Sequence, residues 1–380
     1  MKEKFNILHI ASSNRWTGVA DPATSLAHYQ QHNGNRVWFA CASGRDFADR
    51  ARERDLNVVT SFHLYYKFNP LYTLSDLRSL RAFIAEHEID VVHCHLPHDH
   101  ALAAFAFKKI DRPCILVRTF HRYERPDTDR FHTWLYVKKT DLLITLFQNH
   151  KKAFVNDLKI EEDRVSVIYG GVDTERFSPE VNGDGIRRSL GIPHDAPLAG
   201  IVSRLRRDRG FNWLLHAVPR VLDEIEDARF IIVGRGELED SIRTRINEPI
   251  FKGRVLMAGY RMDDLPNCYA AMDVFVLLGI GADGSCRAAL EAMATGTPVV
   301  GVKLGALCDT IEDHAHGFLV TRNDVNGLAS TLARVLRERE ATRCMGIRAR
   351  ERILESFTEE KRAQESLYAY RRAWERTFSS

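Results

Sequence analysis

Short apolar runs alternate with longer amphipathic segments along the first half of the chain. Residues 5–11 are typical of a buried strand, and residues 74–86 carry apolar side chains at helical spacing. The nearly continuous apolar run at 115–117 indicates a strand that is covered on both faces, as in a parallel sheet. Further strands are predicted at 36–40, 90–93, 114–119 and 142–146, and further helices at 22–31 and 101–107.

The same alternation begins again after Pro179, and the polar segment 182–185 is a plausible linker. Strands alternating with helices predict parallel sheets with crossover helices. We therefore expect the α/β class, with two doubly wound parallel-sheet domains facing across a cleft. Their predicted extents are 1–178 and 179–357, followed by an amphipathic helix within 358–380. In the second domain, strands are predicted at 198–202, 230–233, 255–258, 274–278 and 298–302, and helices at 213–222, 288–294 and 326–337.

Composition and charge narrow the class of protein. The length of 380 residues fits two domains, and 54 basic against 51 acidic residues give a net charge of only +3. A nucleic-acid partner is therefore not expected. The seven cysteines show no C-x-x-C spacing, and no apolar run approaches the roughly 20 residues of a membrane span. We expect reduced thiols and a cytoplasmic protein.

Ligands of open parallel sheets bind where strands run into loops, so the loops carry the candidate chemistry. The most informative segment is 283–300, in which Asp283 and Glu291 are separated by seven residues. Gly284 and Ser285 precede a predicted helix, for which Ser285 is a reasonable N-cap. Free N–H groups at a helix start suit phosphate. The two carboxylates suit sugar and ribose hydroxyls, and a plain loop with solvated acids is the alternative.

A basic loop at 203–210 follows the strand predicted at 198–202. Guanidinium groups suit a diphosphate because they donate paired hydrogen bonds and stay charged. Arginines in this loop, Arg204 and Arg209 among them, would offset charge that builds on a leaving phosphate. Arg206 and Arg207 are basic too, so a solvated basic loop is the alternative.

Five blocks, in order, make the chain resemble the retaining glycosyltransferases of glycosyltransferase family 4, which have the GT-B fold of two Rossmann-like domains. The family has a motif in which two Glu residues are separated by seven residues. The segment 290–300 matches the part of this motif around the second Glu, and Asp283 stands where the first Glu is usual. Arg209 stands where the family's diphosphate loop has Lys, and Gly170 where its interdomain segment has Asn. The other similar blocks are 165–179, 203–210, 232–236 and 304–320.

The resemblance also assigns roles to the N-terminal domain. Gly18 lies in a segment similar to the family's glycine loop, for which an ordinary strand–helix turn is the alternative. The family has a His directly after the corresponding strand, close to the transferred sugar, and His121 stands at this position. A structural role for His121 in its loop is the alternative. His93 and His95 belong to a group of histidines that we place on the acceptor side. A structural role and a metal site are its alternatives, and because its spacing matches no zinc pattern, no metal is predicted.

The resemblance implies a metal-independent, retaining hexosyltransferase that moves a sugar from a UDP- or GDP-linked donor to an acceptor hydroxyl, without a cofactor. The acceptor would be a glycan or a lipid-linked glycan of cell-envelope lipopolysaccharide or polysaccharide biosynthesis. In this family the terminal helix crosses back to the N-terminal domain. A catalytically silent sugar-nucleotide-binding protein and a GT-B epimerase or phosphorylase are the rivals. The predicted catalytic residues are His121, Asp283 and Glu291, and the predicted donor-binding residues are Gly18, Arg204, Arg209, Gly234, Asp283, Gly284, Ser285, Cys286, Arg287 and Glu291.

The aromatic segment 62–72 could rest on a membrane surface or stack on an acceptor sugar, and buried packing is the alternative. If this segment shares a face with Lys108, Lys109 and Arg112, a lipid-linked acceptor and peripheral contact with the cytoplasmic face of the membrane follow.

Overall fold

The computed structural model describes residues 2–13, 16, 18–42, 46–64, 69–107, 110, 112–251, 253–279 and 286–378. The chain forms two compact units. The first unit comprises Met1–Gly171 and Glu359–Ser380, and the second comprises Val172–Gly281 and Cys286–Thr358. The sequence placed this boundary at 178, whereas the units divide after Gly171.

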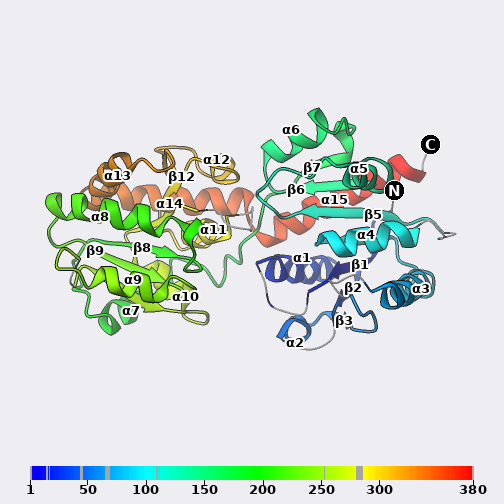
Figure 1. The fold of residues 1–380 in the computed structure, drawn as a ribbon, viewed down its shortest axis with the longest axis horizontal. Helices are drawn as coiled ribbons and strands as arrows, with labels where there is room; N and C mark the ends of the chain where they lie inside the picture. Colours follow the sequence, from blue (N-terminus) through cyan, green and yellow to red (C-terminus); the bar gives the residue numbers. More distant parts are fainter. Residues whose placement is uncertain are drawn as a thin grey trace. The chain divides into compact units, whose positions relative to one another are not determined.

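The first unit is built on a sheet of parallel strands in the order β3-β2-β1-β4-β5-β6-β7 (Figure 1). Successive side chains of each strand enter opposite cores. Ile7 packs with residues of α1, α2 and α15, whereas Leu8 packs with residues of α3 and α4. The sheet is therefore covered on both faces, as the continuous apolar runs predicted. Its strands are β1 (Asn6–Ala11), β2 (Arg36–Cys41), β3 (Asn57–Val59), β4 (Val91–Cys94), β5 (Ile115–Phe120), β6 (Leu142–Thr145) and β7 (Val165–Val167).

Two helices of the first unit, α3 and α4, begin at residues that favour helix starts. Pro70 and Pro97 each occupy the first turn of a helix, where a missing N–H costs nothing. The Asp99 carboxylate accepts hydrogen bonds from the N–H groups of His95 and Leu96, which holds the entry to α4. The helices are α1 (Ala20–His32), α2 (Asp46–Arg52), α3 (Pro70–Glu86), α4 (Pro97–Ala106), α5 (Arg130–Trp134), the π-helical η2 (Leu135–Lys139), α6 (Gln148–Asn156), the 3-10 helix η3 (Glu162–Arg164) and α15 (Glu359–Phe378).

The last helix, α15, belongs to the first unit although it follows the second in sequence. It packs on α1, and its Tyr370 ring meets that of Phe5, the residue before β1, at 6.3 Å between centroids. Arg362 is buried with its ion-pair partner Glu359 at 3.1 Å, and its guanidinium also donates to the carbonyl of Pro22. A buried arginine whose charge is paired fixes the helix against the unit.

The second unit repeats the design with strands in the order β10-β9-β8-β11-β12-β13, again all parallel. Helix α8 packs on α13, and α11 packs on α14. The strands are β8 (Leu198–Val202), β9 (Arg229–Val233), β10 (Val255–Gly259), β11 (Val274–Leu277), β12 (Val299–Val302) and β13 (Gly317–Val320). The helices are α7 (Asp184–Ser189), the 3-10 helix η4 (Arg207–Arg209), α8 (Phe211–Glu224), α9 (Glu239–Ile246), α10 (Leu265–Ala271), α11 (Arg287–Ala294), α12 (Leu307–Thr310), α13 (Val325–Arg337) and α14 (Arg339–Ser356).

The prediction of two doubly wound parallel-sheet domains is confirmed by these two sheets. The predicted helices mostly began too late, because their polar or proline-containing first turns carry no apolar periodicity. Helix α4 begins at Pro97 rather than at residue 101. The short strands β3, β7 and β13 were not predicted, nor were the helices α2, α5, α6, α7, α9, α10, α12 and α14.

Candidate active site

In the second unit, the loops after three neighbouring strands meet where the order of the strands reverses. Strand β8 lies between β9 and β11, so this is the switch point at which open α/β sheets bind ligands. The loops pack backbone against backbone. A Cβ added to Gly234 would lie 1.9 Å from the carbonyl oxygen of Ser203, and one added to Gly279 would lie 2.2 Å from that of Asp208. Glycine at both positions lets the loops close on one another.

The basic loop lies at this switch point, directly after β8. Its 3-10 turn ends at Gly210, whose φ of 79° is left-handed and starts α8. Arg204 is exposed, whereas the Arg209 side chain is only 15% exposed and its Nε lies 3.7 Å from Asp208 Oδ1. Arg206 is 53% exposed. Of the two predicted ligands, Arg204 is therefore open and Arg209 half-buried at the edge of the sheet, and their contact with a diphosphate stays a prediction.

Glu291 is a buried carboxylate with two fixed partners. It lies in α11 at 6% exposure, where Oε2 accepts a hydrogen bond from Tyr269 Oη at 2.9 Å and Oε1 lies 3.1 Å from Arg287 Nε. Burial raises the pKa of Tyr269 well above its ordinary value, so the phenol stays protonated and donates. The sequence named Glu291 and Arg287 but missed Tyr269, because Tyr269 comes from another helix, α10.

The start of α11 differs from the expectation. Cys286, not Ser285, occupies the N-cap, so the prediction of a Ser285 cap was wrong. Cys286 is buried with a left-handed φ of 53°, and its carbonyl oxygen accepts from Ala289 N at 2.8 Å. Asp283, Gly284 and Ser285 lie outside the described residues, and their roles stay predictions.

In the first unit, four buried histidines gather at the equivalent switch point, where β1 lies between β2 and β4. His9 is in β1 and pairs in register with His93 of β4, while His95 and His121 follow β4 and β5. All four are at most 3% exposed. Burial lowers the pKa of His9 to about 4 and those of the other three well below their ordinary value, so the rings are neutral at pH 7. The sequence missed His9 because it sits inside an apolar strand.

Three of these rings come close enough to hold a metal ion. Single ligand atoms of His9, His93 and His95 lie within 4.8 Å of one another. Each ring nitrogen of the three already has a hydrogen-bond partner, however. His9 contacts Gln30 and His95, His95 also contacts His121, and His93 contacts Tyr370 and Thr119. A cation would have to replace several of these bonds, and the absence of a metal stays a prediction.

Gly18 lies between β1 and α1, one residue before Val19, the N-cap of α1. Trp16 packs on the core of the first unit, where its ring meets Phe47 edge-on at 5.7 Å. The guanidinium of Arg50 lies 5.1 Å from the same ring. The contact of Gly18 with a donor stays a prediction.

The aromatic segment divides between core and surface. Phe62 and Leu64 are buried, which fits the packing alternative. Leu71 and Tyr72 are exposed, and the Tyr72 ring stacks on His63 at 4.4 Å. Residues 65–68, Lys108 and Lys109 lie outside the described residues, so the shared face expected for them stays a prediction.

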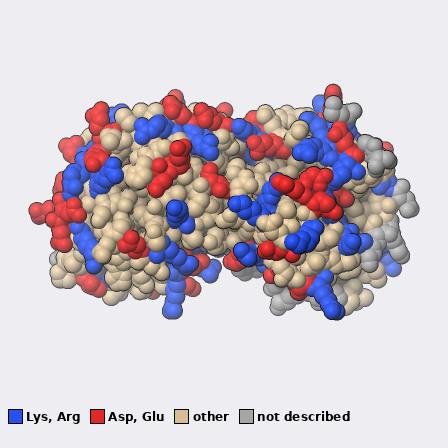
Figure 2. Space-filling model, turned by 90° about the horizontal axis from the view of Figure 1, so that it is seen from above, with Lys and Arg blue, Asp and Glu red and all other residues tan. Residues whose placement is uncertain are grey.

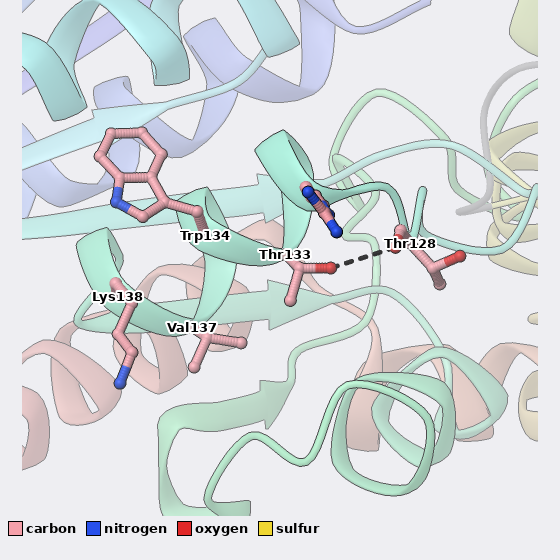
Figure 3. Close-up of a pocket in the computed structure, with 6 residues that line it drawn as sticks. Thr128, Thr133, Trp134, Val137 and Lys138 are labelled. Atoms are coloured by element: carbon pink, nitrogen blue, oxygen red, sulfur yellow. Dashed lines mark hydrogen bonds between the residues drawn. The ribbon is translucent and has the colours of Figure 1, made fainter.

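A pocket of about 370 Å³ opens beside α5 and η2 (Figure 3). One wall is fixed by Thr133, whose hydroxyl donates to the carbonyl of Thr128 at 3.2 Å. Beside it, the rings of Phe105, Phe131 and Trp134 lie within 6.5 Å of one another between centroids, and the first two are exposed. We call these three rings the aromatic patch. The pocket is lined by Thr128, Arg130, Thr133, Trp134, Val137 and Lys138.

The surface carries charges of both signs. Figure 2 shows basic and acidic side chains interspersed over the visible face of each unit. The absence of a nucleic-acid partner stays a prediction. Among the described residues, no helix is long and apolar enough to cross a membrane.

Comparison with known proteins identifies the class. The Glycosyltransferase Family 4 model matches residues 16–176, and the Glycosyl transferases group 1 model matches residues 196–338. A glycosyltransferase structure from Rickettsia africae superposes with a TM-score of 0.84 at 18% identity, covering 98% of this chain and 99% of that one. The chain therefore belongs to the glycosyltransferases of the GT-B fold, as its motifs predicted.

Two further proteins are similar along most of their length. The UDP-Gal:alpha-D-GlcNAc-diphosphoundecaprenol alpha-1,3-galactosyltransferase of Escherichia coli is 29% identical over 301 residues, which is 76% of this chain and 77% of that protein. The Anabaena HepE structure in complex with UDP-glucose has a TM-score of 0.78 at 22% identity, over 96% of this chain and 99% of that one.

Proposed function

We propose that this glycosyltransferase transfers a hexose from a UDP- or GDP-linked donor to an acceptor hydroxyl, with retention of configuration and without a bound metal. The observation that carries the proposal is the buried Glu291 carboxylate, held by Tyr269 and Arg287 beside the start of α11. A carboxylate fixed in this way suits the ribose hydroxyls of a nucleotide. Arg204 and Arg209 supply cationic groups for its diphosphate from the loop after β8.

The reaction needs no protein nucleophile. The acceptor oxygen forms a bond to the anomeric carbon while the bond from that carbon to the donor phosphate breaks. The acceptor proton passes to an oxygen of the leaving phosphate, and the nucleoside diphosphate departs with the bonding electron pair. Arg204 and Arg209 stabilise the charge that develops on the diphosphate. Asp283 and His121 contact the transferred sugar.

For the acceptor, we propose a lipid-linked glycan of the cell envelope. The name of the Escherichia coli relative gives its acceptor as a sugar on diphosphoundecaprenol, which supports this choice. The aromatic patch of the first unit supports it too, because exposed rings next to Arg130, Lys138 and Lys139 suit a surface of anionic lipid.

The test is a transfer assay with radiolabelled UDP- and GDP-hexoses and diphosphoundecaprenol-linked N-acetylglucosamine, with and without EDTA. We expect lipid-linked product from one donor, both with and without EDTA. NMR of the product should show the same anomeric configuration as the donor. Glu291→Gln should reduce transfer and weaken binding of the free nucleotide. Donor consumption without acceptor would favour an epimerase or phosphorylase. Nucleotide binding without turnover on any acceptor would favour a silent binding protein.

A further inference from the structure

A row of four buried side chains crosses the first unit from α1 to the loop after β5. We call it the histidine row, and its members in order are Gln30, His9, His95 and His121. Gln30 Oε1 lies 2.8 Å from His9 Nε2, His9 Nδ1 lies 2.9 Å from His95 Nε2, and His95 Nδ1 lies 3.1 Å from His121 Nε2. None of the four is more than 3% exposed.

The three rings of the row are uncharged at neutral pH. Desolvation lowers the pKa of His9 to about 4, and it lowers the pKa values of His95 and His121 well below the ordinary value. A neutral imidazole has one N–H donor and one bare nitrogen that accepts. A hydrogen bond at one nitrogen therefore determines what the other nitrogen can do.

The orientation of the Gln30 amide sets the direction of the row. Its Nε2 group donates to Tyr370 Oη at 3.2 Å, so its Oε1 faces His9 and can only accept. His9 must then carry its proton on Nε2 and accept at Nδ1. The same step repeats at His95, which donates from Nε2 to His9 and accepts at Nδ1 from His121 Nε2.

We propose that Gln30, through His9 and His95, fixes His121 as the Nε2–H tautomer, so that His121 Nδ1 is a hydrogen-bond acceptor for the substrate. Gln30, His9 and His95 are positioning residues. His121 is the only member of the row that the motifs assigned to catalysis. The described residues provide no hydrogen-bond partner for His121 Nδ1.

A second branch holds the Gln30 amide in place. Tyr370 of α15 accepts from Gln30 and therefore gives its own proton to His93 Nδ1, which lies 2.6 Å away. His93 Nε2 then donates to Thr119 Oγ1, also at 2.6 Å. Turning the amide over would reverse every bond in both branches. The C-terminal helix thus contributes to the protonation pattern at His121.

The consequence for the reaction rests on the proposed function. A bare Nδ1 accepts a hydrogen bond from a sugar hydroxyl, whereas the opposite tautomer would donate to that hydroxyl. The row therefore selects a donor sugar whose hydroxyl near His121 is free to donate. The tautomer itself does not depend on the proposed function, so the two can be tested separately.

The first test reads the tautomers directly. Long-range ¹H–¹⁵N correlation spectra of the full chain with ¹⁵N-histidine distinguish Nε2–H from Nδ1–H rings, and His121→Asn identifies the His121 signals. We expect the Nε2–H pattern for His121 at pH 7. An Nδ1–H pattern or a charged ring in the unmodified protein would overturn the proposal, whatever the variants do.

The second test uses a matched pair of variants. Gln30→Met keeps the volume of the side chain but removes the acceptor, so we expect the His121 pattern to become mixed. Thr140→Val removes a buried hydrogen bond of His100, which belongs to neither branch, so the His121 pattern should not change. If both variants or neither disturb His121, the row does not set its tautomer.

The kinetic readout separates positioning from packing. With a donor sugar that turns over, Gln30→Met should lower kcat/KM by roughly three- to tenfold, the size of one hydrogen bond. Binding of the free nucleoside diphosphate should not change, because Arg204, Arg209 and Glu291, which we propose to hold it, lie in the second unit. An equal loss of kcat/KM in Thr140→Val would show a packing effect only and contradict the proposal. If no sugar turns over, the proposed function fails while the NMR result still decides the tautomer.

Discussion

At the residue scale, Arg209 and Arg206 form a matched pair within one loop. Arg209 is half-buried at the switch point, whereas Arg206 is mostly exposed. Arg209→Ala should weaken binding of a nucleoside diphosphate roughly ten- to a hundredfold, as expected for the loss of a charge-assisted hydrogen bond. Arg206→Ala should have little effect, and Arg209→Lys should retain much of the affinity. Isothermal titration calorimetry measures all three, and equal losses for the two alanine variants would remove Arg209 from the donor site.

Single residues also show what the sequence could not predict. Glu291 and Arg287 are four residues apart on one helix, so their contact follows from helical spacing. Tyr269, which holds the other carboxylate oxygen, comes from a different helix, and only the packing of α10 on α11 brings it there. His9 was missed for a similar reason, because its partners lie in the loop after β4 and on α1.

At the element scale, the buried histidines of the first sheet and its covering helices predict an acid-sensitive unit. The folded-state pKa values of His9 and His150 are lowered to about 4, and those of His93, His95, His100 and His121 are lowered as well. The unfolded chain therefore binds protons first, so stability present above about pH 6.5 is lost as the pH falls toward 4. Each group contributes up to about 1.4 kcal/mol per pH unit.

Hydrogen exchange measured by mass spectrometry at pH 7 and pH 5, corrected for intrinsic exchange rates, checks this expectation. Protection of the first sheet should fall more than protection of the second, which contains none of these six histidines and serves as an internal control. An equal fall in both units would contradict it.

Elements also mark the limit of prediction from periodicity. Long strands with continuous apolar runs, such as β1 and β8, were predicted almost to the residue. Strand β3 has three residues, none of them fully buried, so it produces no apolar run. The buried residues of helix α14 have helical spacing, but three of the five are Thr342, Gly346 and Ala349, so they form no strongly apolar stripe and the helix was missed.

At the scale of the whole molecule, the chain returns to its first unit at the end. The hydroxyl of Tyr370 reaches His93, 277 residues earlier in the sequence. Such a contact leaves no local signal, because α15 has the pattern of an ordinary amphipathic helix. The resemblance to a family, and not the periodicity, was what predicted the return.

The last prediction concerns how the molecule meets its acceptor. If the acceptor is lipid-linked, the protein should co-sediment with anionic vesicles at low salt through the aromatic patch and the neighbouring Lys138 and Lys139. Added salt should release it, because surface charges are screened. Phe105→Ser with Phe131→Ser should weaken this binding while binding of the nucleoside diphosphate is retained.

Ile347→Ser is the matched control, since Ile347 is another exposed apolar side chain but lies on α14 of the second unit. It should sediment with vesicles like the unmodified protein. If the unmodified protein does not sediment with vesicles at low salt, the acceptor is water-soluble. If Ile347→Ser weakens sedimentation as much as the double variant does, the protein adsorbs to vesicles by general hydrophobic contact. Only loss confined to the first-unit variant places the lipid surface at the aromatic patch.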